Sequence, residues 1–526
     1  MKQLITSLFC VVILFSCNKD SVIDNPDPNP DTKTELPTII TDPYSDFTRF
    51  SITVNGTLKD SGSSKIIETG FVVDTFAAPT LEKNLNILVR PTDSYGKMQV
   101  IITNIPAGKK YYLRAYARNN KGVAYGNEIT FSSLAEKVYF GSITLSTQQE
   151  VIEFGRGHYT TINGSLFLTG SITDLAPLKD LAIIDYALEV TNTNQLTTLN
   201  GMDSIMAVGA AGFFHGMRFE NNTALKELNA LKNLTSNNGP LIIVNNDELT
   251  DLSGFDNITY NSFGNIDIQL CEKLTSLHGL EKLNWLDGGI LISDNPNLTD
   301  ISAFGNLSVV TWNIRIYGNP ALPDLHGFEG LHKLDGLEIS GNAVLADISG
   351  LINIDSVDNG ILLTGNEALR DLTGLKNLKE TPDIVIRESP GLYSLNGLQN
   401  IKKLSRGITI ANTGVTSLAG LENLAQASRL EIIFNEKLKN LQGLNGFTSA
   451  PGYGSTVIVS RNDQLESLDG LEKLKNVDGQ IYMGFNPLLN NFCALKTLAL
   501  TGWNGAFILE GNNTNPGIQE IANNCQ

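Results

Sequence analysis

Aspartate residues recur about every two dozen positions from residue 251 onward. Asp300, Asp324, Asp347 and Asp371 follow one another at this spacing, and Asp251 has the same local context. If the intervening segments stacked, neighbouring carboxylates would lie about 5 Å apart, and one calcium ion could bridge two of them. Asp and Ser also cap turns through their own backbone. Serine fills the same position at Ser276, Ser394, Ser417 and Ser467. We therefore favour turn caps over a cation site and predict no metal centre.

A second set of residues could bind a partner. Phe434, Arg461 and Phe485 occupy equivalent positions, so stacking would hold a guanidinium between two aromatic rings. Exposed apolar and aromatic side chains usually mark an interaction site, although a nearby insertion could instead cover and bury them. The remaining candidate ligand-binding residues are Ile433, Tyr482 and Tyr453, the last within the insertion "GFTSAPGYGST", which we expect beside the others.

The sequence contains no arrangement typical of catalysis. It has no Gly-x-Ser-x-Gly elbow and no glycine-rich phosphate loop followed by Lys-Ser/Thr. His278 and His326 share a position but lie two repeats apart, about 9.6 Å, whereas each zinc ligand must lie about 2.0 Å from one ion. We therefore expect no cofactor and no enzymatic activity.

These residues are positioned by one repeated phrase, an apolar-x-apolar triplet with a polar residue, usually Asn, three positions after it. The triplet predicts a short strand with two side chains inward and one outward. A period of 22 to 29 residues is typical of a solenoid. The fifteen predicted strands start at Leu166, Leu188, Met217, Leu241, Ile266, Ile290, Ile314, Leu337, Ile361, Ile384, Ile408, Leu430, Val457, Ile481 and Phe507.

The recurring Asn is predicted to face inward and to form hydrogen bonds with backbone groups of the bend that follows each strand. A buried turn exposes backbone N–H and C=O groups that need partners, and a stacked amide can bond both these groups and the next Asn. Cys271 falls in the same position, so we interpret it as a buried structural thiol. The predicted asparagines are Asn222, Asn246, Asn295, Asn319, Asn342, Asn366, Asn435, Asn462, Asn486 and Asn512.

Residues 137–526 resemble leucine-rich repeats, and more closely the receptor L-domain variety. The opening "EVIEFGRGHYTTINGSLFLTGSITDLAPL" carries the I-x-G-x-L-x-L pattern at Ile162, Gly164, Leu166 and Leu168. The resemblance implies a right-handed leucine-rich-repeat-like β-solenoid of about fifteen coils. It carries no catalytic residues and does not identify a ligand.

Residues 37–134 form a separate β-rich region, and short strands at their spacing predict a β-sandwich. The stretch "IPAGKKYYLRAYARNNKGVAYGNEITF" resembles the end of a fibronectin type III domain. We expect Tyr112 to be a corner tyrosine that bonds nearby backbone, and we expect the domain to act as a spacer. The whole chain is thus predicted to be mainly β.

The N-terminus is predicted to be a targeting segment. Residues 1–16 read as a signal peptide, with Lys2 ahead of an apolar run too short to span a bilayer. "LFSC" resembles a lipobox, which implies lipidation of Cys17. The following "NKDS" resembles the signal that sends lipoproteins of Bacteroidetes-type bacteria to the exterior face of the outer membrane. Residues 17–36, rich in Pro and Asp, are predicted to be an extended lipidated tether.

Cysteine positions and charge complete the prediction. Cys493 and Cys525 both lie near the C-terminus, and a disulfide between them would stabilise a C-terminal cap by about 3–4 kcal/mol. The net charge of −17 argues against nucleic acid as a partner and against membrane contact beyond the lipid anchor. We expect a surface-exposed binding or adhesion module for a host protein or glycan.

Two alternatives stay open at this point: a polysaccharide-active β-helix enzyme and a structural spacer. A lyase needs a base and cationic groups that converge in one groove. The recurring aspartates have no matching series of Arg or Lys.

Replacing Cys17 with Ala should abolish incorporation of a fatty-acid label and release the protein from the membrane fraction into the periplasm. In intact cells, added protease should cleave the wild-type protein. Complete resistance, in a strain whose other surface proteins are cleaved, would contradict surface exposure.

Overall fold

The computed structural model describes residues 35–45, 51–90, 96–103, 106, 108–133, 135–211, 215–261, 264–501, 503 and 505–525. The predicted signal peptide, Cys17 and most of the tether lie outside these residues. The chain divides into two compact units, one mainly before and one mainly after residue 139, although 157–161 and 178–182 belong to the first. No helix in the described ranges is long and apolar enough to cross a membrane.

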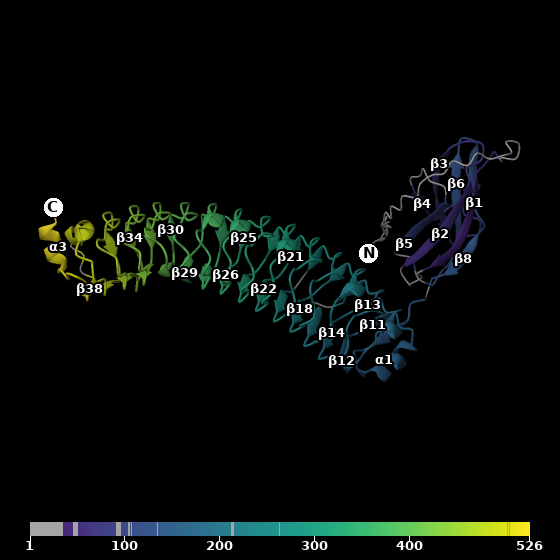
Figure 1. Cartoon of the computed structure of the whole chain (residues 1–526), viewed down its shortest axis with the longest axis horizontal. Coiled ribbons are helices and arrows are strands. Elements are labelled where there is room, and N and C mark those ends of the chain that lie inside the picture. The colour runs from purple at the N-terminus through teal and green to yellow at the C-terminus, as the bar shows by residue number, and fades with distance from the viewer. Residues whose placement is uncertain are drawn as a thin grey trace, which may run out of the picture. The chain divides into compact units, whose positions relative to one another are not determined.

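The N-terminal unit contains two antiparallel sheets that share an apolar core (Figure 1). Phe71, Tyr111 and Phe131 are buried in this core, which confirms a β-sandwich. One sheet contains β1 (Thr38–Ser45), β2 (Ser51–Asp60) and β5 (Gly96–Thr103). The other contains β4 (Asn86–Arg90), β3 (Ile66–Asp74), β6 (Lys110–Asn119), β7 (Gly122–Tyr125) and β8 (Ile129–Ser132).

The expectation for Tyr112 is wrong by one residue. Strand alternation in β6 directs Tyr111 inward and leaves Tyr112 half-exposed. It is the Tyr111 hydroxyl that donates to the backbone carbonyl of Pro106, at 3.1 Å.

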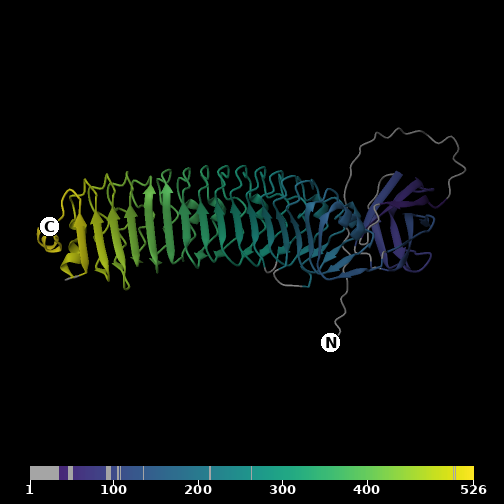
Figure 2. The same ribbon diagram turned by 90° about the horizontal axis from the view of Figure 1, so that it is seen from below.

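The second unit is a β-solenoid of about fifteen turns, here called coils, as predicted. Its parallel strands lie side by side in one long sheet (Figure 2). Nine strands start where the sequence predicted, and the last six start one residue earlier. In chain order the strands are β10 (Ile143–Thr147), β12 (Leu166–Ser171), β14 (Leu188–Thr191), β16 (Met217–Glu220), β18 (Leu241–Val244), β20 (Ile266–Gln269), β22 (Ile290–Ser293), β24 (Ile314–Tyr317), β26 (Leu337–Ser340), β28 (Ile361–Thr364), β29 (Asp383–Ser389), β31 (Gly407–Thr413), β33 (Arg429–Ile433), β35 (Thr456–Ser460), β37 (Gln480–Gly484) and β38 (Ala506–Glu510).

Both ends of the solenoid carry helices. The sequence analysis did not anticipate β10 or the helix α1 (Gln148–Gly155), which starts at a capping box formed by Thr147 and Glu150. At the C-terminus, α2 (Lys496–Leu500) and α3 (Ile518–Asn524) form the predicted cap. The predicted disulfide between Cys493 and Cys525 is present.

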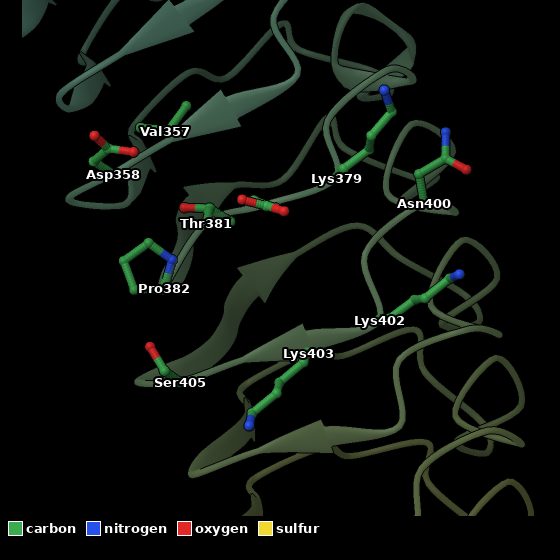
Figure 3. A pocket seen from close by; sticks show the side chains of 10 residues that line it. Val357, Asp358, Lys379, Thr381, Pro382, Asn400, Lys402, Lys403 and Ser405 are labelled. Atoms are coloured by element: carbon green, nitrogen blue, oxygen red, sulfur yellow. The ribbon is translucent and has the colours of Figure 1, made fainter.

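A second face of the solenoid carries shorter strands in three separate sheets. The first contains β9 (Val138–Phe140), β11 (Thr161–Asn163), β13 (Ile183–Ile184), β15 (Ala207–Val208), β17 (Ser236–Asn237), β19 (Tyr260–Asn261), β21 (Trp285–Leu286) and β23 (Val309–Val310). The second pairs β25 (Lys333–Leu334) with β27 (Ser356–Val357). The third contains β30 (Lys403–Leu404), β32 (Gln426–Ala427), β34 (Ser449–Ala450) and β36 (Asn476–Val477). A pocket opens between β27 and β30 (Figure 3).

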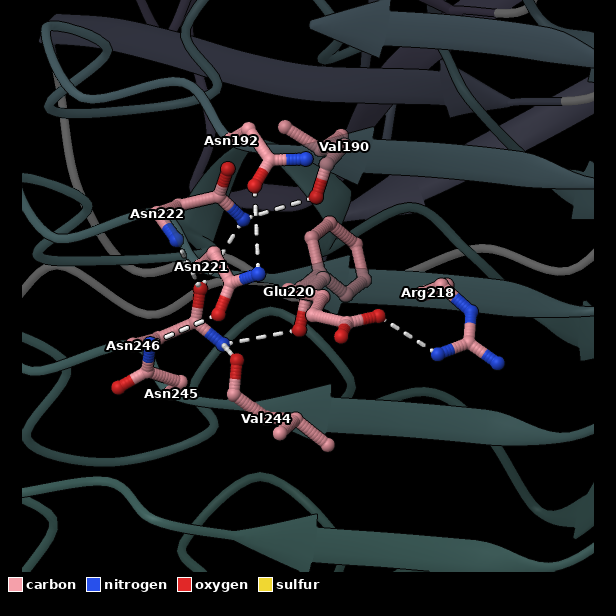
Figure 4. A network of polar contacts seen from close by, with 10 residues as sticks. Val190, Asn192, Arg218, Glu220, Asn221, Asn222, Val244, Asn245 and Asn246 are labelled. Carbon is pink, nitrogen blue, oxygen red and sulfur yellow. Dashed lines mark hydrogen bonds and ion pairs between the residues drawn. The ribbon is translucent and has the colours of Figure 1, made fainter.

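The predicted asparagines form a buried ladder, which we call the asparagine ladder. Asn222 illustrates it: its side-chain amide donates to the Val190 carbonyl at 2.8 Å and to the Asn246 side-chain oxygen at 3.0 Å (Figure 4). The nine members from Asn222 to Asn486 have no exposed surface, and Asn512 is half-buried. Each side-chain amide therefore donates a hydrogen bond to a buried backbone carbonyl of the preceding coil. Where the next residue of the ladder is also Asn, the amide donates to the side-chain oxygen of that Asn as well.

Three positions interrupt the ladder. Cys271 is fully buried, as predicted, and burial raises the pKa of its thiol to about 11. Ser389 and Thr413 fill two consecutive coils, and the Thr413 hydroxyl donates to Asn435 at 2.6 Å. Ladder bonding resumes beyond these coils and ends at the C-terminus, where Asn512 donates to Asn515.

The sequence analysis missed a second row of asparagines, which lies on the surface. Each side-chain amide donates to a carbonyl of the preceding coil, as Asn306 does to Glu281 at 2.7 Å. Other members of this row are Asn233, Asn257, Asn353, Asn377, Asn400 and Asn423.

The two rows allow a matched stability test. Asn319→Ala should lower the free energy of unfolding by about 2–4 kcal/mol, because it strands the buried Ile292 carbonyl and the Asn295 amide. Asn306→Ala removes one exposed hydrogen bond and should cost about 0.5–1 kcal/mol. Urea denaturation followed by circular dichroism measures both, and equal losses would contradict the role assigned to burial.

Candidate ligand-binding surface

One position in every coil requires an unusual backbone. It is the residue directly before the asparagine-ladder position of each coil, and its φ lies between about +50° and +72°, in the left-handed region. Gly and Asn tolerate this region best. They fill it at Gly170, Asn192, Asn221, Asn245, Gly318, Gly341, Gly365, Asn412 and Gly511. We call this series of equivalent positions the left-handed column.

Large side chains occupy the left-handed column in three consecutive coils near the C-terminus. Phe434, Arg461 and Phe485 have φ values of 58°, 56° and 56°. Their coils are adjacent, because β33 pairs with β35 and β35 pairs with β37. The fold would accept Gly or Asn at all three positions with less backbone strain.

These three side chains stack as the sequence predicted. The Arg461 guanidinium carbon lies 5.3 Å from the centre of the Phe434 ring and 4.9 Å from that of Phe485. Both rings stay exposed, at 49% and 44%. The insertion does not bury them, so the alternative in which it covers the set is wrong.

An apolar band lies on the adjoining outer face of the long sheet. Ile458, Tyr482 and Ile508 are paired across β35, β37 and β38, and their side chains are half-buried or exposed. The Tyr482 hydroxyl donates to Glu510 at 2.8 Å, and burial together with this bond raises the pKa of Tyr482. Ile433, which directly precedes Phe434, is also half-buried. Ile458 and Ile508 were not among the ligand-binding residues predicted from the sequence.

Arg461 has no acidic partner in the described part of the chain. Some solenoid arginines do have one: Arg315 pairs with Glu338 at 2.9 Å, and Arg429 pairs with Asp383 at 2.8 Å. The Arg461 guanidinium is thus held between two rings with its N–H donors available. A planar guanidinium held in this way matches a carboxylate or another oxyanion through two parallel hydrogen bonds.

Tyr453 does not lie beside this set, contrary to expectation. Its insertion leads into β35 from the Thr456 end, whereas Arg461 directly follows the Ser460 end. Five strand residues separate the two edges, which is about 16 Å of extended chain. Tyr453 is fully exposed at its own edge.

The recurring aspartates form turn caps, the interpretation favoured from the sequence. Asp300 accepts from the Ser302 amide at 2.8 Å, and Asp324, Asp347 and Asp371 each bond the amide two residues later in the same way. Within the described ranges, no group of three or more His, Cys, Asp or Glu side chains is placed to hold a metal ion.

A scan of protein-family models and a search of curated proteins find no match to this chain. The function of this chain must therefore be inferred from the chemistry of the site itself.

A double-mutant cycle tests the stacking. Phe434→Gly, Arg461→Gly and the double variant should give a coupling energy of about 0.5–1 kcal/mol in urea denaturation, typical of an exposed cation–π contact. Gly suits the left-handed backbone and, unlike Asn, cannot form a new hydrogen bond to its neighbour in the column, so the cycle isolates the two side chains. A coupling of zero would mean that the ring and guanidinium are adjacent without attraction.

Proposed function

We propose that this chain is a lipid-anchored outer-membrane protein, facing the cell exterior, whose solenoid binds a host protein or glycan without catalysis. The observation that carries this proposal is the set formed by Phe434, Arg461 and Phe485. It combines exposed aromatic surface, an unpaired guanidinium and a backbone position that disfavours all three residues.

Backbone strain supports a binding role over a structural one. A non-glycine residue in the left-handed region costs about 1–2 kcal/mol, less for Asn. Exposed cation–π contacts return about 0.5–1 kcal/mol each. Stability alone therefore gives little reason for these residues in three consecutive coils, and residues kept in strained backbone regions cluster at functional sites.

The composition of the set indicates the chemistry of its partner. Aromatic and Arg side chains dominate binding hot spots. The free guanidinium favours a carboxylate or another oxyanion, while the rings and the adjoining Ile458 and Ile508 favour an apolar or ring-shaped flank. Three coils extend over about 10 Å at about 4.8 Å per coil, which suits one acidic side chain with its neighbours or a short acidic glycan.

The remaining domains are consistent with display away from the membrane. The region 37–134, which resembles a fibronectin type III domain, would act as a spacer after a Pro-rich tether. The resemblance of the solenoid to receptor L-domains and leucine-rich repeats also favours binding, because it carries no catalytic residues.

Glycan and protein arrays probed with the purified chain in detergent test the proposal. We expect at least one specific signal in the wild type that falls at least tenfold in the variant Phe434→Asn/Arg461→Asn/Phe485→Asn. A loss of about 2 kcal/mol or more is typical when hot-spot residues are removed.

Leu270→Asn provides a matched control. Leu270 occupies the left-handed column, is 49% exposed and lies several coils away from the set. This variant should keep the array signal. Absence of any signal, or a signal that survives the triple substitution, would overturn the proposal.

A further inference from the structure

Two adjacent coils separate on the second face of the solenoid. Backbone hydrogen bonds join the Lys379 amide to Asp355 and the Ala425 amide to Lys402, each at 2.9 Å, but in the described ranges none joins Lys402 to Lys379. The strand β30 pairs with β32 on one side only, and the sheet of β25 and β27 ends before it. Pro382, which has no amide hydrogen, follows at the corner, where its carbonyl accepts from Arg406 and Gly407.

This separation opens a pocket of about 710 Å³. In Figure 3, Lys379, Asn400 and Lys402 lie on one side and Asp358, Pro382 and Ser405 on the other. The remaining lining residues are Val357, Glu380, Thr381 and Lys403. Ligand pockets in proteins fall in this range of volume, and the space is sufficient for one or two sugar rings.

Three lysines give the pocket more positive than negative charge, because Glu380 is the one carboxylate of its lining without an ion-pair partner in the described residues. Lys379, Lys402 and Lys403 are exposed, and none has an ion-pair partner in the part of the chain that the structure describes. Of the two pocket carboxylates, Asp358 pairs with Lys333 at 2.8 Å. In a chain with a net charge of −17, this is a local excess of positive charge.

We propose that this pocket binds an acidic sugar, that is, a sugar ring carrying a carboxylate. The lysines on one side would bind the carboxylate. On the other, Ser405 and the Asp358 carboxylate would accept hydrogen bonds from ring hydroxyls, and Glu380, which also lines the pocket, would accept one more. A compact anion such as phosphate has no ring hydroxyl groups to donate to these acceptors, so the mixture of groups favours a ligand that has both an anionic and a hydroxylated part.

This inference goes beyond the proposed function and stands on different residues. The pocket lies on the second face, in coils that precede the set of Phe434, Arg461 and Phe485. A protein partner at that set and an acidic sugar in the pocket could both be present, so each site can be tested alone.

Isothermal titration calorimetry of the purified chain with glucuronate, galacturonate and N-acetylneuraminate tests the proposal. Glucose, galactose and inorganic phosphate serve as comparisons. At least one acidic sugar should bind, with its neutral counterpart and phosphate at least tenfold weaker. The variant Lys379→Gln/Lys402→Gln should weaken binding at least tenfold, because it removes two charged hydrogen-bond donors.

Lys475→Gln is the matched control. Lys475 occupies the position of Lys379 and Lys402 in a coil that is not separated, since its amide bonds the Thr448 carbonyl at 2.8 Å. It should bind like the wild type, as should Phe434→Asn/Phe485→Asn, which tests the other site. Failure of all three acidic sugars to bind, equal binding of neutral sugars or phosphate, or unchanged affinity in the double lysine variant would overturn the proposal.

Discussion

The buried asparagine amide is the interaction on which the solenoid depends. Each strand of the long sheet ends at a bend whose backbone groups face the interior, where no water can bond them. The amides of Asn319 and its equivalents supply both a donor for the preceding coil and an acceptor for its amide groups. An unpaired buried polar group costs about 1–3 kcal/mol, so the bend favours an amide at this position in coil after coil, whatever the length of the coil.

The same bend explains the left-handed column. The chain must turn immediately before the ladder position, and φ there is positive in coil after coil. In the early coils Asn192, Asn221 and Asn245 accept this backbone and also bond to one another through their side chains. Phe434, Arg461 and Phe485 replace that amide stack with an aromatic and cationic one. The backbone preference of Asn agrees with the left-handed conformation that the fold requires, whereas the preferences of Phe and Arg conflict with it. Such conflicts between local preference and fold are expected at functional sites.

Much of this organisation could be read from the sequence, because it repeats. The period predicted the starts of fifteen strands of the long sheet to within one residue but missed β10. The shared phase of Phe434, Arg461 and Phe485 was enough to predict their stacking. Each of the last six strands starts one residue earlier than predicted, at Asp383 or Arg429 for example. This extra residue belongs to the strand because its backbone pairs with the neighbouring coil, which the apolar-x-apolar triplet does not predict. Tyr453 was misplaced although chain order already puts its insertion before the strand and Arg461 after it, at opposite edges of the long sheet.

The lysine pocket was harder to foresee for a different physical reason. It results from a missing contact between two coils, and a missing contact leaves no repeated residue type to count. Pro382 and the two consecutive coils without a ladder asparagine, at Ser389 and Thr413, are the features of the sequence that coincide with it. Departures from the repeat were thus more informative about possible sites than the repeat itself.

Electrostatics sets a final constraint on what an acidic chain can bind. Charges on the surface are screened over about 8 Å at physiological ionic strength, which is less than two coils of the solenoid. A net charge of −17 therefore need not prevent an anion from binding at Arg461 or at the lysine pocket, provided that the nearest acids are absent or already paired. Arg461 meets this condition through the lack of an acidic partner in the described residues. At the pocket, Asp358 is paired with Lys333, which leaves the single carboxylate of Glu380 against three lysines. Recognition then depends on the positions of the few charged side chains that lie within some ångströms of the ligand. Coils joined by the hydrogen bonds of the asparagine ladder position these side chains more rigidly than a mobile loop would.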